Sequence, residues 1–259
     1  DLLAKNYKKY NKQIIDLEKK ISNEDEKPNF ISEDLRKRQY LSGLSVEDLE
    51  LILHPMAEEG KEASGSMGDD TPVAVLSSHF RPVSHYFRQN FSQVTNPPID
   101  SLRENKVMSL KTRFGNLGNI LDFDNLTEEN IYVLDSPILT NSQFKKFRKF
   151  FSKKTKVIDC TFDISSSLKD RIEAIRVEAE TSVREGSTCL ILSDKNISNQ
   201  KATIPSILVV GAVHSYLVKQ GLRGYCSLNV ECSDALDTHS FAVLIGVGAT
   251  TVNPYLAID

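Results

Sequence analysis

The chain has 259 residues, of which 40% are hydrophobic and 26% charged, so it can bury one sizeable core. Its formal net charge of -3 gives no reason to expect a nucleic-acid partner, because phosphate binding requires clustered positive charge. The longest apolar runs, at residues 207–213 and 241–247, are much shorter than the roughly 20 residues of a membrane-spanning helix, so we expect no membrane partner.

The N-terminal part of the chain is highly charged and carries one apolar stripe. The first 38 residues hold 18 charges, and apolar residues recur there at spacings of three and four, at Leu3, Tyr7, Tyr10, Ile14, Leu17 and Ile21. This period predicts a helix from about residue 2 to 21, followed by a connector at 22–29. We expect the helix to pack on its own protein, the alternative being a module that docks a partner. The predicted domains are a charged helical extension and connector, 1–38, and a main domain, 39–259.

A second helix, a loop and a strand are predicted before the regular part of the chain. Ser45 and Asp48 have capping-box spacing, and the apolar positions after them predict a helix that ends towards Gly60. The glycine-rich run 65–72 predicts a loop, and the apolar run 73–76 predicts a short buried strand.

From about residue 131 onward, predicted strands and helices alternate. The predicted strands are at 131–134, 157–162, 189–192, 225–230 and 251–256, and the predicted helices are at 167–184, between Pro205 and Gly221, and at 235–245. Such repeats favour right-handed crossovers and a parallel sheet. A complete eight-unit barrel typically needs about 250 residues, and the first 130 here are irregular. The expected fold class is therefore α/β, an incomplete or degenerate (β/α) barrel-like parallel sheet with an irregular helical N-terminal region.

The sequence shows no strong catalytic or metal-binding motif. GxSxG, HExxH and P-loop patterns are absent, and Gly246 and Gly248 lie where a predicted helix ends, which favours a C-cap over a phosphate site. The histidines lack metal-ligand spacing, and His214 and His239, inside predicted helices, are expected to have structural roles. Four cysteines without CxxC spacing predict buried free thiols. We therefore expect no catalytic residue, metal or cofactor in this chain.

A proline-rich loop lies within a region of alternating arginines and aromatic residues, residues 79–119. Two prolines in the run Thr95-Asn96-Pro97-Pro98 exclude a helix interior or central strand, so the run predicts a rigid extended loop. Composition leaves open whether it braces an interface or lines a site. The arginines also motivate an alternative function, an autonomous α/β enzyme or a binding domain for a phosphate-bearing ligand.

Several sequence strings occur in the order in which one known family has them. They are LHPM at 53–56, residues 65–72, the run 79–104 with FRQNFSQVTNPPIDSLRE at 87–104, MSL at 108–110, RFGN at 113–116, DSP at 135–137, GAVH at 211–214 and the close from 239 through NPYLA at 253–257. On these strings, residues 40–259 resemble the central domain of the NADPH- or ferredoxin-dependent glutamate synthase large subunit. Ser215 and Ser240 depart from the second histidine that the family often has, so we expect no histidine pair.

The resemblance implies a place within a larger enzyme. In that family a glutaminase domain releases ammonia from glutamine, and an FMN-binding barrel combines it with 2-oxoglutarate to make glutamate. These two domains and ammonia in transit are the implied partners, and FMN and an iron–sulfur cluster would bind outside this chain. The implied location is cytoplasmic, or plastid in a photosynthetic eukaryote.

The resemblance also implies site residues. Thr95 and Asn96, together with Asp69 and Asp70, would line an intramolecular ammonia tunnel as lining or gating groups rather than as chemical groups. The structural loop around them would consist of Arg88, Pro97, Pro98 and Arg103. Adjacent aspartates in a loop otherwise cap helices or accept backbone N–H groups more often than they bind a metal.

Overall fold

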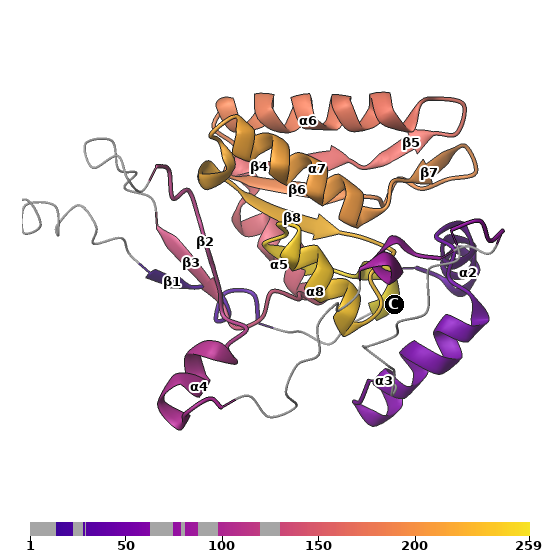
Figure 1. Ribbon diagram of the computed structural model, residues 1–259, viewed down its shortest axis with the longest axis horizontal. Helices are drawn as coiled ribbons and strands as arrows, with labels where there is room; N and C mark the ends of the chain where they lie inside the picture. The colour runs from indigo at the N-terminus through magenta and orange to yellow at the C-terminus, as the bar shows by residue number, and fades with distance from the viewer. Residues whose placement is uncertain are drawn as a thin grey trace, which may run out of the picture.

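The computed structural model describes residues 14–22, 28, 30–62, 75–78, 81–87, 98–119 and 130–259. Within them the molecule is mixed α/β and is centred on a four-stranded parallel sheet (Figure 1). The strands, in spatial order, are β4 (Thr155–Asp159), β6 (Cys189–Ser193), β8 (Ser227–Glu231) and β9 (Thr251–Asn253). Neighbours in space are neighbours along the chain in this sheet, as short connections between successive elements favour. The predicted α/β repeat is confirmed from the second predicted strand onward. The predicted strand at 131–134 forms, but it lies in a separate mixed sheet, and the described strands form no closed barrel.

The first predicted strand, 157–162, is divided by a turn at Asp159. The Asp159 Oδ1 atom accepts hydrogen bonds from the Thr161 backbone N–H at 2.9 Å and from its hydroxyl at 2.8 Å. This local contact turns the chain out of the sheet. A hairpin of β5 (Thr161–Asp163) and β7 (Lys201–Thr203) extends beyond the sheet as a result.

Three helices cover one face of the parallel sheet: α6 (Leu168–Arg184), α7 (Ser206–Lys219) and α8 (Thr238–Gly246) (Figure 1). Their apolar faces pack on Ile158, Leu190, Leu228 and Val252 of the strands. The Ser167 hydroxyl accepts the Asp170 N–H at the start of α6, and Gly186 takes a positive φ of 97° just after it, as the sequence predicts.

The opposite face is covered by α5 (Asn141–Phe150) and a small second sheet. That sheet has the order β1 (Ile14–Asp16), β3 (Ile131–Leu134), β2 (Thr112–Phe114), with β1 parallel and β2 antiparallel to β3. Phe144, Phe147 and Phe151 join the two sheets, because they pack against Cys189 and Ile191 of β6 in one buried cluster. Helix α5 was not predicted from the sequence, although Thr140 and Gln143 form a complete capping box at its start.

The predicted N-terminal helix is wrong over residues 14–21, and its residues 2–13 lie outside the described part of the chain. Residues 14–16 form β1, because their backbone pairs with β3. The chain then turns, since the Leu17 carbonyl accepts the N–H groups of Lys20 and Ile21. Leu17 and Ile21 are buried, as the apolar stripe predicts. They lie in the core because of a strand followed by a turn, and not because of a helix.

The segments before the parallel sheet are short and irregular. They comprise α2 (Ser32–Leu41), a π-helical turn η1 (Asp48–Leu53), α3 (His54–Glu59), a 3₁₀ turn η2 (Val83–Tyr86) and α4 (Ser101–Val107). The predicted helix after Ser45 is confirmed, since the Ser45 hydroxyl bonds the Asp48 carboxylate at 2.8 Å and Gly60 ends α3 with a φ of 65°. The predicted strand at 73–76 is wrong at Val75 and Leu76, which form an exposed turn with Leu76 97% accessible.

The remaining short elements are η3 (Ser152–Lys154), η4 (Arg223–Tyr225) and α9 (Tyr255–Ile258). The predicted last strand, 251–256, ends at Asn253, because Pro254 lacks the N–H that would continue the ladder and α9 begins directly after it. None of the helices in the described ranges has the length and apolar character needed to cross a membrane.

Candidate functional site at the carboxyl edge of the sheet

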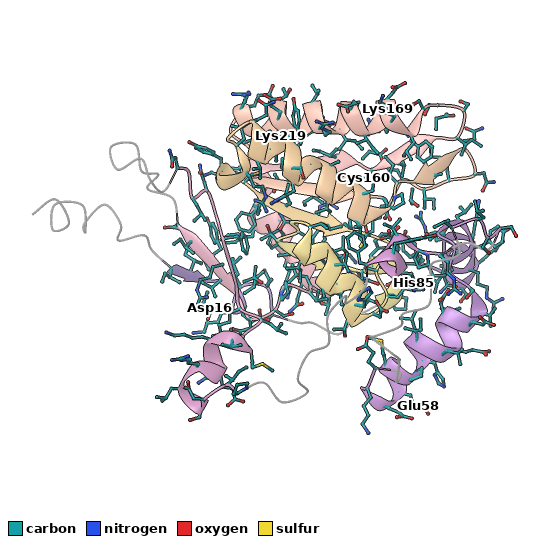
Figure 2. The ribbon with its side chains drawn as sticks, viewed as in Figure 1. Asp16, Glu58, His85, Cys160, Lys169 and Lys219 are labelled. Atoms are coloured by element: carbon teal, nitrogen blue, oxygen red, sulfur yellow. The ribbon has the colours of Figure 1, made fainter. Side chains whose placement is uncertain are left out.

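The carboxyl ends of parallel strands meet at one edge of a sheet, where open α/β folds usually bind their ligands. Here β6 ends at Ser193 and is followed by Asp194 and Lys195. Strand β8 ends at Glu231, with further polar residues after it, and β4 is followed by Cys160, which Figure 2 labels. This edge therefore gathers the largest set of buried polar groups among the described residues.

Glu231 of β8 is a buried carboxylate held by groups from β6, from the segment after β6 and from α5. Its Oε2 atom accepts the Ser193 hydroxyl at 2.6 Å, and its Oε1 atom lies 2.8 Å from Lys195 Nζ. Arg148 of α5 places Nη1 3.8 Å from the same Oε1 atom. Because both cations compensate the buried charge, the arrangement ties β6, β8 and α5 together.

Asp194 is the second buried acid at this edge. Its Oδ2 atom accepts the Ser233 N–H at 2.9 Å and the Ser233 hydroxyl at 2.7 Å. Burial, together with the nearby Asp234 carboxylate, raises the pKa of Asp194 to about 7. Tyr255 lies beside it, and burial and the Asp194 charge raise the pKa of the phenol, although no well-aligned hydrogen bond joins the two.

Asp194→Asn is expected to flatten the pH dependence of stability. The pKa of Asp194 rises from 3.8 to about 7 on folding, so between these two pH values the folded chain holds a proton that the unfolded chain has lost. The free energy of unfolding of the unmodified chain therefore falls as pH rises through this range. At about pH 8 the variant, which stays neutral, should be more stable by on the order of 2–4 kcal/mol. The difference should shrink as pH falls and disappear at about pH 3, below the unfolded-state pKa of 3.8.

Denaturant unfolding at a series of pH values measures this difference, with Asp163→Asn as a control of opposite sign. Hydrogen bonds from Ser165 hold the pKa of the exposed Asp163 below its usual value, so its contribution to stability is present above that value and is lost as pH falls. Parallel stability curves for Asp194→Asn and the unmodified chain would contradict the assignment.

The polar groups deeper in the sheet also have structural partners. Asn229 Oδ1 accepts the Thr251 hydroxyl at 2.8 Å, and Asn229 Nδ2 donates to the Leu190 carbonyl at 3.1 Å. Asn253 Nδ2 donates to Asn141 Oδ1 at 2.9 Å, which joins β9 to the start of α5. Such satisfied networks fix register and packing.

A small cavity adjoins these side chains at the carboxyl edge. A cavity of about 10 Å³ lies among Cys160, Asp194, Ser206, Glu231 and Cys232. That volume is on the scale of one water molecule. Ligand sites for cofactor-sized molecules typically have roughly 300 Å³ or more, so this cavity is far smaller than such a site.

The predicted free thiols are confirmed, because all four cysteines are buried and unpaired with one another. Burial raises the pKa of Cys160 and Cys232 well above the usual thiol value, and that of Cys189 and Cys226 to about 11. Thiols of this kind stay protonated and unreactive near neutral pH. No group of three or more histidine, cysteine or acidic side chains suited to a metal occurs in the described ranges.

The opposite, amino edge of the sheet is closed by Arg223. Its guanidinium donates to His214 Nδ1 at 3.1 Å, to the Cys226 carbonyl at 2.7 Å and to the Gly248 carbonyl at 2.9 Å. Burial and Arg223 lower the pKa of His214, which keeps the ring neutral and able to accept this bond. His239 Nε2 lies 3.0 Å from the Ser84 carbonyl. Both helical histidines are therefore hydrogen-bonded within the fold, which is consistent with the structural roles expected for them.

Gly248→Ala is expected to lower the free energy of unfolding by about 1–3 kcal/mol, because it combines backbone strain with overpacking. Gly248 follows α8 as a C-terminal cap with a φ of 121°, and an added Cβ would lie 2.3 Å from His214 Nδ1. The cap predicted from sequence is confirmed, since Gly248 N–H bonds the Ile245 carbonyl.

Gly246→Ala is the matched control two residues away. An added Cβ at Gly246 meets no atom within 4 Å, so this change should leave stability unchanged or raise it by up to about 1 kcal/mol through helix propensity. Equal destabilisation by both substitutions in thermal unfolding would contradict the cap.

The structure describes only two of the residues expected at the site. Pro98 and Arg103 flank Asp100, whose carboxylate accepts the N–H groups of Leu102 and Arg103 and thereby caps α4. Arg103 Nε lies 3.2 Å from Asp100 Oδ2. Thr95, Asn96, Asp69, Asp70, Arg88 and Pro97 lie outside the described residues. The carboxyl-edge network, in contrast, was not predicted, although polar residues directly after predicted strands were a visible signal.

These features define an α/β domain with an open parallel sheet whose described carboxyl edge is filled by its own ion pairs and hydrogen bonds. Residues 37–259 match the family model described as glutamate synthase central domain, and the chain belongs to this family. The resemblance inferred from sequence strings is thereby confirmed.

Curated relatives agree with this assignment. The chain is 56% identical over 227 residues to a protein named glutamate synthase [NADPH] large chain from Azospirillum brasilense, covering 86% of this chain and 15% of the relative. It is 41% identical over 230 residues to the Bacillus subtilis protein of the same name, with the same two shares. A chloroplastic ferredoxin-dependent glutamate synthase of Oryza sativa is 39% identical over 234 residues, 88% of this chain and 14% of that protein. The chain therefore spans about one seventh of these relatives, which is 14–15% of their length.

Proposed function

We propose that this chain is the central connecting module of a glutamate synthase and is itself non-catalytic. It holds a glutaminase domain and an FMN-binding domain in register, and the parent makes glutamate from glutamine and 2-oxoglutarate. The observation that carries this proposal is the family match over residues 37–259, in relatives named as glutamate synthases that are several times longer.

A structural role is supported by the chemistry of the sheet edges. At the carboxyl edge Glu231 is neutralised by Lys195 and Arg148, and Asp194 is bonded to Ser233. These groups hold elements together, and the small cavity among them is far smaller than a site for a cofactor-sized ligand. FMN and the iron–sulfur cluster of the parent would then bind in other parts of the longer protein.

The barrel-like character expected from sequence remains a proposal that the sheet order supports. Four parallel strands follow one another in chain order, as adjacent strands of a (β/α) barrel do. Ile138 adds an isolated parallel bridge to Val252 of β9. We take the domain to be an incomplete barrel of four regular strands, with α5 and the small sheet packed on the face that would be the barrel interior.

Within this module, Thr95 and Asn96, with Asp69 and Asp70, are proposed to line the ammonia path. Neutral ammonia must be kept from bulk water, which would protonate or dilute it, so the wall needs a rigid backbone. The prolines at 97 and 98 restrict the backbone, and Asp100 fixes the end of the loop by capping α4. The proposed compartment is the cytoplasm, or a plastid where the source is photosynthetic, as for relatives named chloroplastic.

The isolated chain gives the first test. Purified and shown to be folded by circular dichroism, it should be colourless, should hydrolyse no glutamine, and should bind neither FMN nor inorganic phosphate in calorimetric titrations. Stoichiometric binding of FMN or phosphate would instead favour the alternative, an autonomous α/β enzyme or a binding domain for a phosphate-bearing ligand.

A further inference from the structure

Helix α4 is exposed on all sides within the described structure. None of its seven residues is buried, and Figure 1 shows it standing away from the parallel sheet. Leu102 is 88% accessible and Met108, just after the helix, is 69% accessible, with Val107 and Leu110 also exposed. An isolated helix of this length is not stable in water, because its few hydrogen bonds do not offset the cost of nucleation. Its stability therefore requires a contact that the described residues do not supply.

A cleft beside α4 adds a second, independent feature. It has a volume of about 590 Å³ and lies between α4 and the segment that leads into β2. Its charged lining is mainly positive, from Lys106, Lys111 and Arg113 against the single carboxylate of Glu104. Lys106 and Arg113 make no ion pair within the described ranges. Lys111 is paired with Asp135 at 3.3 Å, but such an exposed pair contributes little and is readily exchanged.

We propose that α4 and this cleft form the docking surface for a neighbouring domain of the same polypeptide, which presents carboxylates flanked by apolar side chains. The inference rests on the proposed function, since it requires a longer parent chain, and relatives extend far beyond the region that this chain matches. Apolar side chains around a cationic cleft are complementary to that chemistry. A second copy of this chain fits less well, because a two-fold contact would oppose the same cations.

Hydrogen exchange in the full-length parent protein tests the packing of α4. The Met108 amide bonds the Glu104 carbonyl, and the Glu104 amide bonds the Asp100 carbonyl, so both report whether the helix is held. Both amides should exchange at least about tenfold more slowly than in an unprotected peptide. The double substitution Lys106→Glu and Arg113→Glu should abolish most of this protection, whereas Lys169→Glu on the exposed surface of α6 should not change it (Figure 2). Unprotected rates in the parent would overturn the proposal.

Crosslinking identifies the occupant. A zero-length reagent that joins amines to carboxylates should link Lys106 or Lys111 of the full-length protein to aspartate or glutamate residues outside the 259 residues of this chain. Links confined to this chain, for example to the acidic residues at 122, 124, 128 and 129, would overturn docking of another domain. Both measurements report packing, so their failure would leave the proposed function standing, whereas FMN binding by the isolated chain would refute that function without affecting them.

Discussion

Phe147→Ala is expected to lower the free energy of unfolding by about 3–5 kcal/mol, the range typical of a buried phenylalanine that leaves a cavity. Phe147 is fully buried in α5, and its ring lies 5.9 Å from that of Phe114 and 4.9 Å from that of Phe151. It therefore joins the small sheet to the helix that covers the parallel sheet. Loss of its ring should remove its packing against both Phe114 and Phe151.

Phe150→Ala on the same helix is the matched control. Phe150 is 38% exposed and packs on the edge of the cluster, so its loss should cost about 1 kcal/mol. Urea unfolding monitored by circular dichroism measures both. If Phe147→Ala lowers the free energy of unfolding by no more than Phe150→Ala does, α5 does not join the layers as described.

The alternating second half of the chain was predictable because its signals are local. Ser167 and Asp170 lie at the start of α6, Gly186 follows its end, and Gly248 follows the end of α8. Each signal acts over a few residues of chain, through backbone hydrogen bonds and φ preferences. The effect of such signals does not depend on the tertiary packing. Element boundaries moved by a few residues where Asp159 and Pro254 redirect the chain.

The N-terminal prediction failed for a reason that local pattern cannot detect. Leu17 and Ile21 are spaced as on a helix, yet β3 offers backbone groups that pair with Ile14–Asp16. A partner more than a hundred residues away therefore decided the conformation, and the apolar spacing fitted a strand followed by a turn equally well. Sequence strings identified the family, but they carry no information on such pairings.

The carboxyl-edge network was beyond sequence reasoning for the same reason. Ser193 and Glu231 are 38 residues apart and meet only because β6 and β8 are neighbours in register. Arg148 reaches Glu231 from α5, a helix that the sequence analysis did not predict. The type of each residue was visible in the sequence, but the partner that neutralises each charge depends on the order of strands in the sheet.

Thr95→Trp in the full-length enzyme is expected to uncouple the two half-reactions. If residue 95 lines the path for ammonia, an indole in place of a small hydroxyl side chain should obstruct transfer between the two active sites. Glutamine hydrolysis would continue while ammonia escapes to solvent instead of reaching 2-oxoglutarate. Thr95→Ser keeps the hydroxyl and the small volume, so it should retain the coupling of the unmodified enzyme.

The deciding measurement is the ratio of glutamine hydrolysed to 2-oxoglutarate consumed, taken on the full-length enzyme and both variants under the same conditions. A connecting module that encloses the ammonia path predicts a ratio close to equality for the unmodified enzyme and for Thr95→Ser, and a ratio well above equality for Thr95→Trp. A ratio that stays at equality in Thr95→Trp would contradict the placement of this loop on the path and, with it, the proposed channel role of the domain.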